Sequence, residues 1–453
     1  MADPLFEHTI AAIATAPGRG AVAMLRVSGP EAASVLMRVC PTIGIVPPPR
    51  RQVLAAVHHP HSNELIDRAL VSYFPAPFSY TGDDTVEIST HGGAITPQLV
   101  LDALFAAGAQ PAQPGEFTNR ALLNGKLDLL QAEAVLDIID GRSAAFHRAA
   151  INQVERGLSG RIEELRSALL ELEALLVYSI DFPDEDEPPV PPARVHATAA
   201  DVLQRIDHLL STAPEGELLR EGALVVLAGR PNSGKSSLFN TLLGTERAIV
   251  TQVPGTTRDA LEAAITIDGY PFRLVDTAGI RTTSDPVESI GIEVARKYLR
   301  AANVVIVCIE AGRAPGPEEK AFIQDLDSSR TIITWTKEDL YPNRSTADGG
   351  LAVSALRGTG MEGLRQRLLQ VSFGTIVGDP GEAPLVTKQR HARALRAARG
   401  EVESFEAAFR SGVPAELAVT HLRSATGQLE DLIGVVSSDD VLGRVFGDFC
   451  VGK

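Results

Sequence analysis

Residues 229–236 read Gly-Arg-Pro-Asn-Ser-Gly-Lys-Ser, the pattern Gly-x-x-x-x-Gly-Lys-Ser of a phosphate-binding loop. The apolar run Ala223–Ala228 precedes the loop and predicts a buried strand, and Ser237–Leu243 follows it with a helix-compatible sequence. Glycines let the backbone curl so that its N–H groups face phosphate oxygens, and the start of a helix adds partial positive charge. Lys235 is expected to contact the terminal phosphates, and the Ser236 hydroxyl to bind Mg²⁺. The stretch therefore predicts a nucleotide-binding α/β domain.

A polar string after a second strand-like run adds to the phosphate side of this site. Asp276–Gly279 reads Asp-Thr-Ala-Gly and follows the run Phe272–Val275. An Asp at a strand end can hold Mg²⁺ through water, and the Gly279 N–H can sense a γ-phosphate. Upstream, residues 255–259 read Gly-Thr-Thr-Arg-Asp, and these threonines can give a hydroxyl to Mg²⁺ and close over the nucleotide.

The choice of base is indicated further along the chain. A predicted strand, Thr331–Trp335, runs into Thr336-Lys337-Glu338-Asp339. The Asp339 carboxylate can accept from N1 and N2 of guanine together, a donor pair that adenine lacks. A backbone N–H of Val353–Ala355 would then support the base O6. The order of these strings resembles that of the translation-factor-like GTPases.

Two positions depart from the usual GTPase pattern. Thr336 stands where such enzymes usually have Asn. Its hydroxyl can donate to guanine N7 and bond backbone, but it lacks the second arm of a carboxamide. We therefore expect guanine selection to rest on Asp339, with lower affinity for the base. Ile280 stands where Ras-type enzymes place the Gln that orients the attacking water. Another group must position that water and neutralise the transition-state charge.

Composition limits the classes of protein that remain. A chain of 453 residues predicts about three domains, and a net charge of −15 argues against a protein that coats nucleic acid non-specifically. No run of about 18 apolar residues occurs, so no transmembrane helix is expected. The start of the chain, Met1–His8, lacks the pattern of a signal peptide. Cys40, Cys308 and Cys450 are too few and too scattered for a disulfide framework or a zinc site, which favours a cytoplasmic location.

The first part of the chain is expected to form an α/β domain over residues 1–122. Its strand-like runs are Ala21–Val27, Ala69–Phe74 and Thr85–Ser89.

Helical periodicity flanks the nucleotide module on both sides. Apolar residues from Ile151 to Leu176 recur every three or four positions and predict one long helix, with a further helix around 196–211. The same period returns between Leu395 and Phe409, and more helix is expected around 415–434. The apolar stripe could face a membrane or a coiled-coil partner, but an intramolecular bundle is the simpler interpretation.

Neither helical block closes a large bundle alone, so the sequence favours one discontinuous helical domain with an inserted domain. The expected fold class is α/β and α. It combines an N-terminal α/β domain with a helical domain in two parts, 123–217 and 379–453, and a Ras-like P-loop GTPase domain over 218–378.

At this point a family resemblance becomes specific. Residues 229–236, 254–259 (Pro-Gly-Thr-Thr-Arg-Asp) and 276–281 (Asp-Thr-Ala-Gly-Ile-Arg) resemble the MnmE (TrmE) tRNA modification GTPases. Further matching strings are spread over the chain: Ala16–Gly20, Leu25–Gly29, Ser79–Asp83, His91–Gly93, Pro114–Thr118, Asn124–Asp128, Gln131–Ala134, Ile180–Pro183 and Phe449–Lys453. The resemblance covers essentially the whole length.

The resemblance implies a cytoplasmic homodimer joined through its N-terminal domains. Those domains would bind a folate one-carbon donor, 5-formyl- or 5,10-methylene-tetrahydrofolate, through Arg26, Glu87, Lys126 and Lys453. With a flavoprotein partner, MnmG, the family installs an aminomethyl or carboxymethylaminomethyl type of group on carbon 5 of the wobble uridine in certain tRNAs. The resemblance implies no contact with a membrane.

The resemblance also implies a GTPase that K⁺ and dimerisation of the GTPase domains switch on. The implied K⁺ ligands are Asn232, Thr251, Val253 and Thr256, and the implied Mg²⁺ ligands are Ser236 and Thr257. The implied catalytic residues are Lys235 and Glu288. The implied contacts to GTP and its ions are Asn232, Ser233, Gly234, Lys235, Ser236, Ser237, Thr251, Gln252, Val253, Pro254, Gly255, Thr256, Thr257, Asp276, Thr277, Ala278, Gly279, Thr336, Lys337, Asp339, Ser354 and Ala355.

Several readings stay open at the level of sequence. Glu288 is either the group that orients the attacking water or a solvated loop acid, and Cys450 is either a catalytic thiol or a small residue packed near the folate. For the whole chain, one alternative is a ribosome-assembly GTPase of the Era/Der group. Against it stand a single nucleotide cassette and the lack of a basic C-terminal module. The other alternative is a folate-binding dimer whose GTPase acts only as a regulatory switch.

Overall fold

The structure is a computed structural model of the 453-residue chain. It describes residues 8–181, 191–245, 262–276, 296–341, 349–374, 386–435, 443, 445–447 and 449–452. The chain divides into two compact units, Met1–Leu136 with Glu430–Lys453, and Asp137–Leu429. Within the described ranges, no helix combines the length and apolar character that crossing a membrane requires.

The first unit is built on a six-stranded sheet in the order β3-β4-β5-β2-β1-β6. Neighbouring strands are antiparallel except for β1 and β6. The strands are β1 Ile10–Ile13, β2 Val22–Ser28, β3 Val53–His58, β4 Leu65–Phe74, β5 Thr85–His91 and β6 Gln110–Pro111. The strands predicted around 21–27, 69–74 and 85–89 are confirmed as β2, β4 and β5.

Alternation along these strands decides which face of the sheet is covered. Leu25 and Val27 of β2 are buried with Val35 of α1 (Ala32–Val39) and Leu104 of α2 (Thr96–Ala106), so these two helices cover one face. Arg26 lies between them in sequence and therefore belongs to the opposite face. That face carries a smaller apolar cluster around Ile10 and Phe117, the latter on α3 (Glu116–Leu123).

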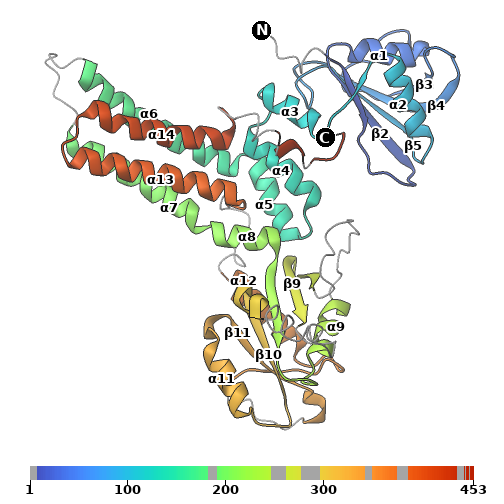
Figure 1. The fold of residues 1–453 in the computed structure, drawn as a ribbon. Coiled ribbons are helices and arrows are strands. Elements are labelled where there is room, and N and C mark those ends of the chain that lie inside the picture. The colour runs from blue at the N-terminus through green and yellow to red at the C-terminus, as the bar shows by residue number, and fades with distance from the viewer. Residues whose placement is uncertain are drawn as a thin grey trace, which may run out of the picture. The chain divides into compact units, whose positions relative to one another are not determined.

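Long helices make up much of the second unit. Within it lie α5 Ala144–Val154, α6 Gly157–Asp181, α7 Pro192–Ser211, α8 Ala213–Glu221 and α13 Gln389–Arg410. Helices α4 Leu129–Asp140 and α14 Ala415–Ile433 each cross a boundary between the units. The helices predicted around 196–211, 395–409 and 415–434 are confirmed. Figure 1 shows α6, α7, α13 and α14 running side by side. They come from stretches far apart in the sequence, as a discontinuous helical bundle requires.

The prediction of one long helix from Ile151 to Leu176 is wrong. The chain breaks at Arg156, whose φ of 70° is left-handed, and the stripe is divided between α5 and α6. Leu158, Leu165 and Leu172 of α6 are buried as predicted, but Ile151 of α5 is exposed. The spacing of three and four residues continues through the break, so the periodicity gave no sign of it.

The nucleotide module contains the second sheet, in the order β12-β11-β10-β7-β9-β8. Its strands are β7 Ala223–Ala228, β8 Glu262–Ile267, β9 Tyr270–Asp276, β10 Val304–Glu310, β11 Thr331–Thr336 and β12 Leu351–Ala352. All pairings are parallel except that of β8 with β9. Helices α9 Lys235–Thr245, α11 Pro317–Asp325 and α12 Met361–Phe373 accompany this sheet (Figure 1). The predicted strands at 223–228, 272–275 and 331–335 are confirmed.

Two helices of the helical part pack on this second sheet. Phe146 and Ala149 of α5 and Leu219 of α8 belong to the same buried cluster as Leu274 of β9. The N–H of Ala145 donates to the Gly269 carbonyl oxygen at 2.9 Å. The hairpin of β8 and β9 is therefore joined directly to α5.

Candidate nucleotide-binding site

The parallel strands of the second sheet end at one edge, and the predicted nucleotide residues follow those strand ends. The phosphate loop follows β7, Asp276 ends β9, Glu310 ends β10, Thr336 ends β11 and Ser354 lies just beyond β12. Ligands of open α/β sheets bind at this edge because the loops after the strands converge there. The topology thus brings the phosphate and base elements together.

Backbone geometry explains the glycines of the phosphate loop. Gly229 has a φ of 147°, and a Cβ placed there would lie 2.4 Å from the carbonyl oxygen of Cys308 on β10. Gly234 has a φ of 85° and packs against the Thr336 side chain. Both positions therefore require glycine. Asn232 is also left-handed, with a φ of 60°, and its side chain is exposed.

Lys235 begins α9 with its ammonium group drawn back over the loop. Its Nζ donates to the carbonyl oxygens of Gly229 at 2.9 Å and Arg230 at 2.7 Å, and the residue is only 4% exposed. Burial of an ammonium is stabilised by such charge-assisted hydrogen bonds. Behind it, burial raises the pKa of the Cys308 thiol to about 12, so this cysteine stays neutral. The arrangement places one cation within the loop.

The two predicted magnesium contacts of the described chain lie together. The Ser236 hydroxyl donates to Oδ2 of Asp276 at 2.7 Å, although 40 residues separate them. A hydroxyl and a carboxylate are hard oxygen donors, which suit Mg²⁺ with water in its remaining positions. The residues present therefore fit the ion that the sequence implies. Among the described residues no larger cluster of His, Cys, Asp or Glu offers a metal site.

On the base side, two carboxylates are held by neighbouring side chains. The Ser354 hydroxyl donates to Oδ1 of Asp339 at 2.6 Å, and Ser354 is fully buried. Lys337, left-handed at a φ of 58°, donates to Oε1 of Glu310 at 3.1 Å. These contacts fix the direction of the Asp339 loop.

Helix α9 supports the far side of the base region. The Thr241 hydroxyl lies 3.1 Å from the Ala355 carbonyl oxygen, within hydrogen-bond distance. It also lies 2.9 Å from the Ser237 carbonyl oxygen of its own helix, so Ala355 lies next to the helix that starts in the phosphate loop.

Of the two roles expected of the Thr336 hydroxyl, the structure shows the contact with backbone. Thr336 is 3% exposed, and its hydroxyl lies 2.6 Å from the Ser233 carbonyl oxygen and 3.2 Å from that of Ile309. A hydroxyl has one proton, and both neighbours are acceptors. The proton is therefore committed to the backbone behind the phosphate loop.

A charged cluster beside the phosphate loop was missed by the sequence reasoning. Glu319 of α11 receives two hydrogen bonds from the Arg313 guanidinium, and Nε of Arg230 lies 3.7 Å from its carboxylate. The N–H of Gly316 also donates to Glu319 at 2.9 Å. Hydrogen bonding with Arg313 lowers the pKa of Glu319 to about 2. The sequence analysis also did not single out Glu310, although an acidic residue at the end of a parallel strand is a usable signal for a site residue.

Part of the predicted site lies outside the residues that the structure describes. These residues are Thr251, Gln252, Val253, Pro254, Gly255, Thr256, Thr257, Thr277, Ala278, Gly279, Glu288 and Lys453. Their roles remain predictions.

The second predicted site lies in the first unit, where Arg26 and Glu87 contact each other. They face each other across β2 and β5, with Nη2 of Arg26 2.9 Å from Oε1 of Glu87. The Arg26 guanidinium also lies over the rings of Tyr80, at 5.2 Å, and Phe117, at 5.7 Å. A buried cation, a carboxylate and two rings are thus brought together.

Two other predicted residues of this unit lie nearer the surface. Lys126 is exposed, and its Nζ donates to the Pro77 carbonyl oxygen at 3.0 Å. Cys450 is exposed. The residue before it, Phe449, is buried, and the residue after it, Val451, forms a β-bridge with Pro114. The thiol is therefore not packed within the part of the chain that the structure describes.

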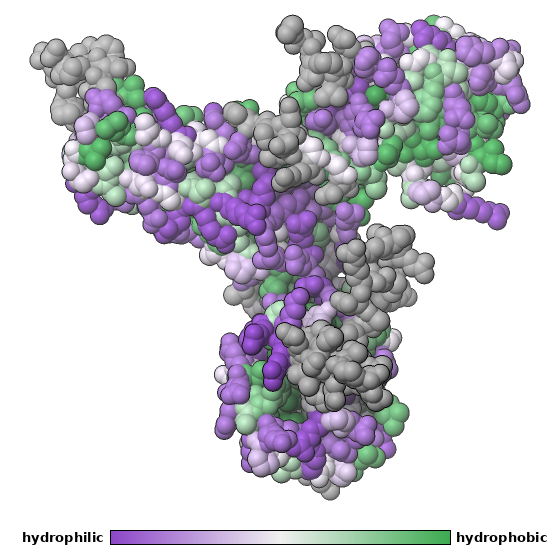
Figure 2. Space-filling model, viewed as in Figure 1, coloured by the Kyte–Doolittle hydropathy of each residue, from purple (hydrophilic) through white to green (hydrophobic). Residues whose placement is uncertain are grey.

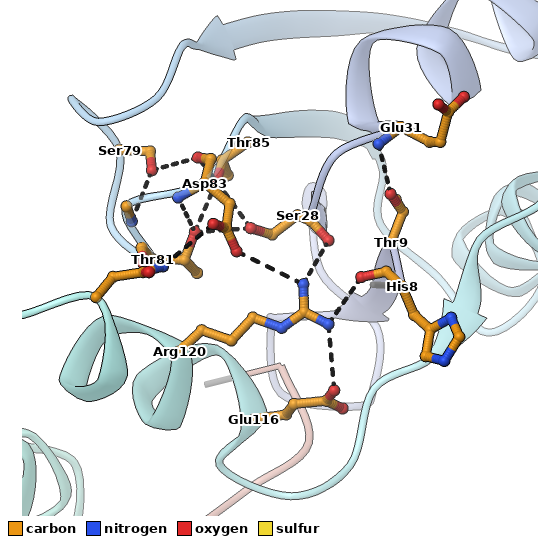
Figure 3. A network of polar contacts seen from close by, with 12 residues as sticks. His8, Thr9, Ser28, Glu31, Ser79, Thr81, Asp83, Thr85, Glu116 and Arg120 are labelled. Atoms are coloured by element: carbon orange, nitrogen blue, oxygen red, sulfur yellow. Dashed lines mark hydrogen bonds and ion pairs between the residues drawn. The ribbon is translucent and has the colours of Figure 1, made fainter. Parts of the chain in front are cut away.

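A buried arginine holds the segment that carries Tyr80. Arg120 of α3 is 1% exposed and donates to the carbonyl oxygens of Ser28, at 3.2 Å, and His8, at 2.8 Å. Its guanidinium also lies between Asp83, 3.7 Å away, and Glu116, 3.4 Å away (Figure 3). Such a charge is tolerated inside a protein only with partners on several sides. The network links α3 to the start of the chain, the end of β2 and the turn before β5.

Comparison with known proteins places the chain in a family. Residues 129–450 match the model of the MnmE helical domain, and residues 9–126 match that of the GTP-binding protein TrmE N-terminus. The tRNA modification GTPase MnmE of Moorella thermoacetica is 40% identical over 464 residues, covering 99% of this chain and 100% of the relative. That of an Azoarcus species is 42% identical over 460 residues, covering 99% of each.

Solved structures align over the nucleotide module. The G domain of the T. maritima FeoB iron transporter is 28% identical and covers 33% of this chain and 98% of that chain, with a TM-score of 0.26. A score of that size supports no argument, so the assignment rests on the sequence relatives and the domain models. With matches of this identity over nearly the whole of both sequences, the chain belongs to the MnmE family of tRNA modification GTPases.

Proposed function

We propose that this chain is a K⁺-stimulated GTPase that modifies carbon 5 of the wobble uridine of certain tRNAs. It would act in the cytoplasm with the flavoprotein MnmG and use a tetrahydrofolate one-carbon donor. One observation carries the nucleotide part: Lys235, Ser236, Asp276 and Asp339 gather at one edge of the sheet from three separate stretches. Relatives that match the whole chain are named tRNA modification GTPases.

In this proposal Mg²⁺ is bound by Ser236 and Thr257, with Asp276 acting through water. Bound Mg²⁺ would neutralise charge on the β- and γ-phosphates. Lys235 contacts the terminal phosphates, and the two N–H donors of guanine bind the Asp339 carboxylate. The 2.7 Å contact between Ser236 and Asp276 and the orientation of Asp339 by Ser354 support this assignment.

Because Ile280 cannot orient water or neutralise charge, a monovalent cation supplies the positive charge in this proposal. We propose that K⁺ is held by Asn232, Thr251, Val253 and Thr256, and that Glu288 orients the attacking water. The left-handed backbone and exposed side chain of Asn232 support its part, since its amide oxygen is not engaged in burying the loop.

The cation mechanism predicts markedly faster GTP hydrolysis in K⁺ than in Na⁺ at equal ionic strength. K⁺ is the larger ion and fits a site made of carbonyl and amide oxygens. The smaller Na⁺ contacts the same oxygens poorly. Steady-state phosphate release by the full-length protein is the measurement, with Asn232→Ala as the variant that should lose the difference. Equal rates in both salts would remove the cation mechanism and the role of Asn232.

For the folate we propose Arg26, Glu87, Lys126 and Lys453 as contacts. The chemistry of the described residues fits such a ligand: carboxylates suit the donor edge of a pterin, rings suit its flat face, and cations suit the glutamyl tail. The Arg26–Glu87 pair beside Tyr80 supports this reading.

We further propose that the chain has four segments with boundaries at 1–122, 123–217, 218–378 and 379–453, and that two copies join through the N-terminal domain.

On the sheet face away from α1 and α2, Leu54 and Leu70 lie opposite each other and are 64% and 42% exposed. Figure 2 shows hydrophobic residues gathered on one side of this part of the molecule. Apolar side chains left in water, here Leu54 and Leu70, favour burial against a second copy.

Mass analysis of wobble uridines in a deletion strain tests the function of the whole molecule. Uridines that lack the carbon-5 group support the proposal, and complementation with this chain should restore them. Normally modified uridine in the deletion strain would reject it. That result would favour a GTPase of another role, such as ribosome assembly.

A further inference from the structure

Thr336 stands at the end of β11, where the usual carboxamide of a guanine site is replaced by a hydroxyl. The hydroxyl is buried, 2.6 Å from the Ser233 carbonyl oxygen and 3.2 Å from that of Ile309. Guanine N7 is an acceptor and needs a donated proton. Because the single proton of Thr336 faces two carbonyl oxygens, none is left for the base.

The contact acts on the peptide bond between Ser233 and Gly234. Within the described residues the one cis peptide is Ala76–Pro77, so the Ser233–Gly234 bond is trans. In a trans peptide the C=O and the following N–H point in opposite directions. Holding the Ser233 carbonyl oxygen toward β11 therefore directs the Gly234 N–H away from Thr336.

Packing leaves this peptide little freedom to turn. A Cβ placed on Gly234 would lie 3.2 Å from both Cβ and Oγ1 of Thr336. The β11 strand end is itself fixed, since the N–H of Ala311 donates to the Thr336 carbonyl oxygen at 2.9 Å. The orientation of one loop amide is thus set from the strand that also leads to Asp339.

We propose that Thr336 serves the phosphates rather than the base: its hydroxyl holds the Ser233–Gly234 peptide so that the Gly234 N–H faces a nucleotide phosphate. Guanine N7 receives no hydrogen bond from this residue. The inference rests on the proposed GTP site and assigns one of its residues to a different part of the nucleotide. It makes Thr336 a positioning residue.

The test compares two nucleotides that differ only at N7. Equilibrium dissociation constants of the full-length protein are measured for GTP and for 7-deaza-GTP, in which a C–H replaces N7. Wild-type protein should bind the two within about twofold. Thr336→Val, which removes the hydroxyl and keeps the shape, should weaken both by about tenfold, the range for stranding a buried carbonyl oxygen. Thr336→Ser keeps the hydroxyl and should bind both nearly as the wild type does.

Thr334 provides a matched control on the same strand. It is fully buried, and among the described residues its hydroxyl has no hydrogen-bond partner. Thr334→Val should leave both dissociation constants unchanged, and thermal unfolding should show that each variant is folded.

Two results would overturn the inference. The first is a wild-type protein that binds 7-deaza-GTP at least about fivefold more weakly than GTP, with Thr336→Val abolishing that gap. The second is Thr336→Val binding both nucleotides as tightly as the wild type. Failure of the proposed GTP site looks different, because the wild-type protein would then bind neither nucleotide.

Discussion

At the scale of single residues, the nucleotide site depends on side chains that the surrounding backbone holds in place. Lys235 is the clearest case, since its ammonium group is buried in the loop and hydrogen-bonded to two carbonyl oxygens. These contacts hold the cation within the phosphate loop. A phosphate would then meet a charge that needs little reorganisation.

We expect Lys235→Ala to weaken GTP binding by about a hundredfold or more, since a charge-assisted contact to phosphate is lost. Titration of the full-length protein with GTP by calorimetry measures the change. Lys320→Ala, on the exposed side of α11, is the matched control and should bind as the wild type does. An unchanged affinity in Lys235→Ala would remove the site assignment.

At the scale of elements, the segment from Glu310 to Glu319 links the base side to the phosphate loop. Glu310 pairs with Lys337, while Glu319 pairs with Arg313 and lies near Arg230 of the loop. The end of β10 is therefore tied to the base side, and the start of α11 to the phosphate loop.

The Glu319 contact predicts a pH dependence of stability. Its pKa is lowered in the folded chain to about 2, from an ordinary value of 4.5. The stabilisation that ionised Glu319 gives to the folded chain is therefore present above about pH 4.5 and is lost as the pH falls toward 2. Glu319→Gln should lower the free energy of unfolding at pH 7 by about 1 kcal/mol, as partly exposed ion pairs do.

Urea unfolding of wild type and Glu319→Gln at several pH values measures this difference. The gap between them should narrow below pH 4.5. Glu318→Gln is the neighbouring control, because Glu318 is far more exposed and has only a 3.4 Å contact with Arg230. A gap that stays constant down to pH 3 would contradict the assignment.

At the scale of the whole molecule, the first compact unit leaves a surface that another copy could cover. The sheet face that carries Leu54 and Leu70 has neither α1 nor α2 against it. Leu54 and Leu70 face each other on neighbouring strands, so their side chains form one apolar pair there.

If this face joins two copies, the double substitution of Leu54→Glu with Leu70→Glu should shift the protein to monomer, because charge would have to be buried. Sedimentation equilibrium measures the mass. Leu356→Glu, at a position 86% exposed in the nucleotide module, is the control and should keep the wild-type mass. A dimer that survives the double substitution would place the interface elsewhere.

Local sequence determined the parts whose signals lie in neighbouring residues. The strand at 223–228 has the predicted bounds because a fully apolar run before a glycine loop can be buried on both faces. The loop pattern, the strand ends and the split helical domain could also be predicted, since each follows from spacing or order. Whole-length family matches could be expected from the short strings.

Only the tertiary structure decided which distant groups meet. The break at Arg156 was hidden because helical spacing runs through it, and Glu319 gave no sign of its partners six and 89 residues away. The sequence shows that Thr336 carries a hydroxyl group. It does not show that this hydroxyl donates to a carbonyl oxygen 103 residues earlier in the chain. The sequence gives the chemical type of each side chain directly. Which group that side chain contacts depends on how the strands are ordered in the sheet.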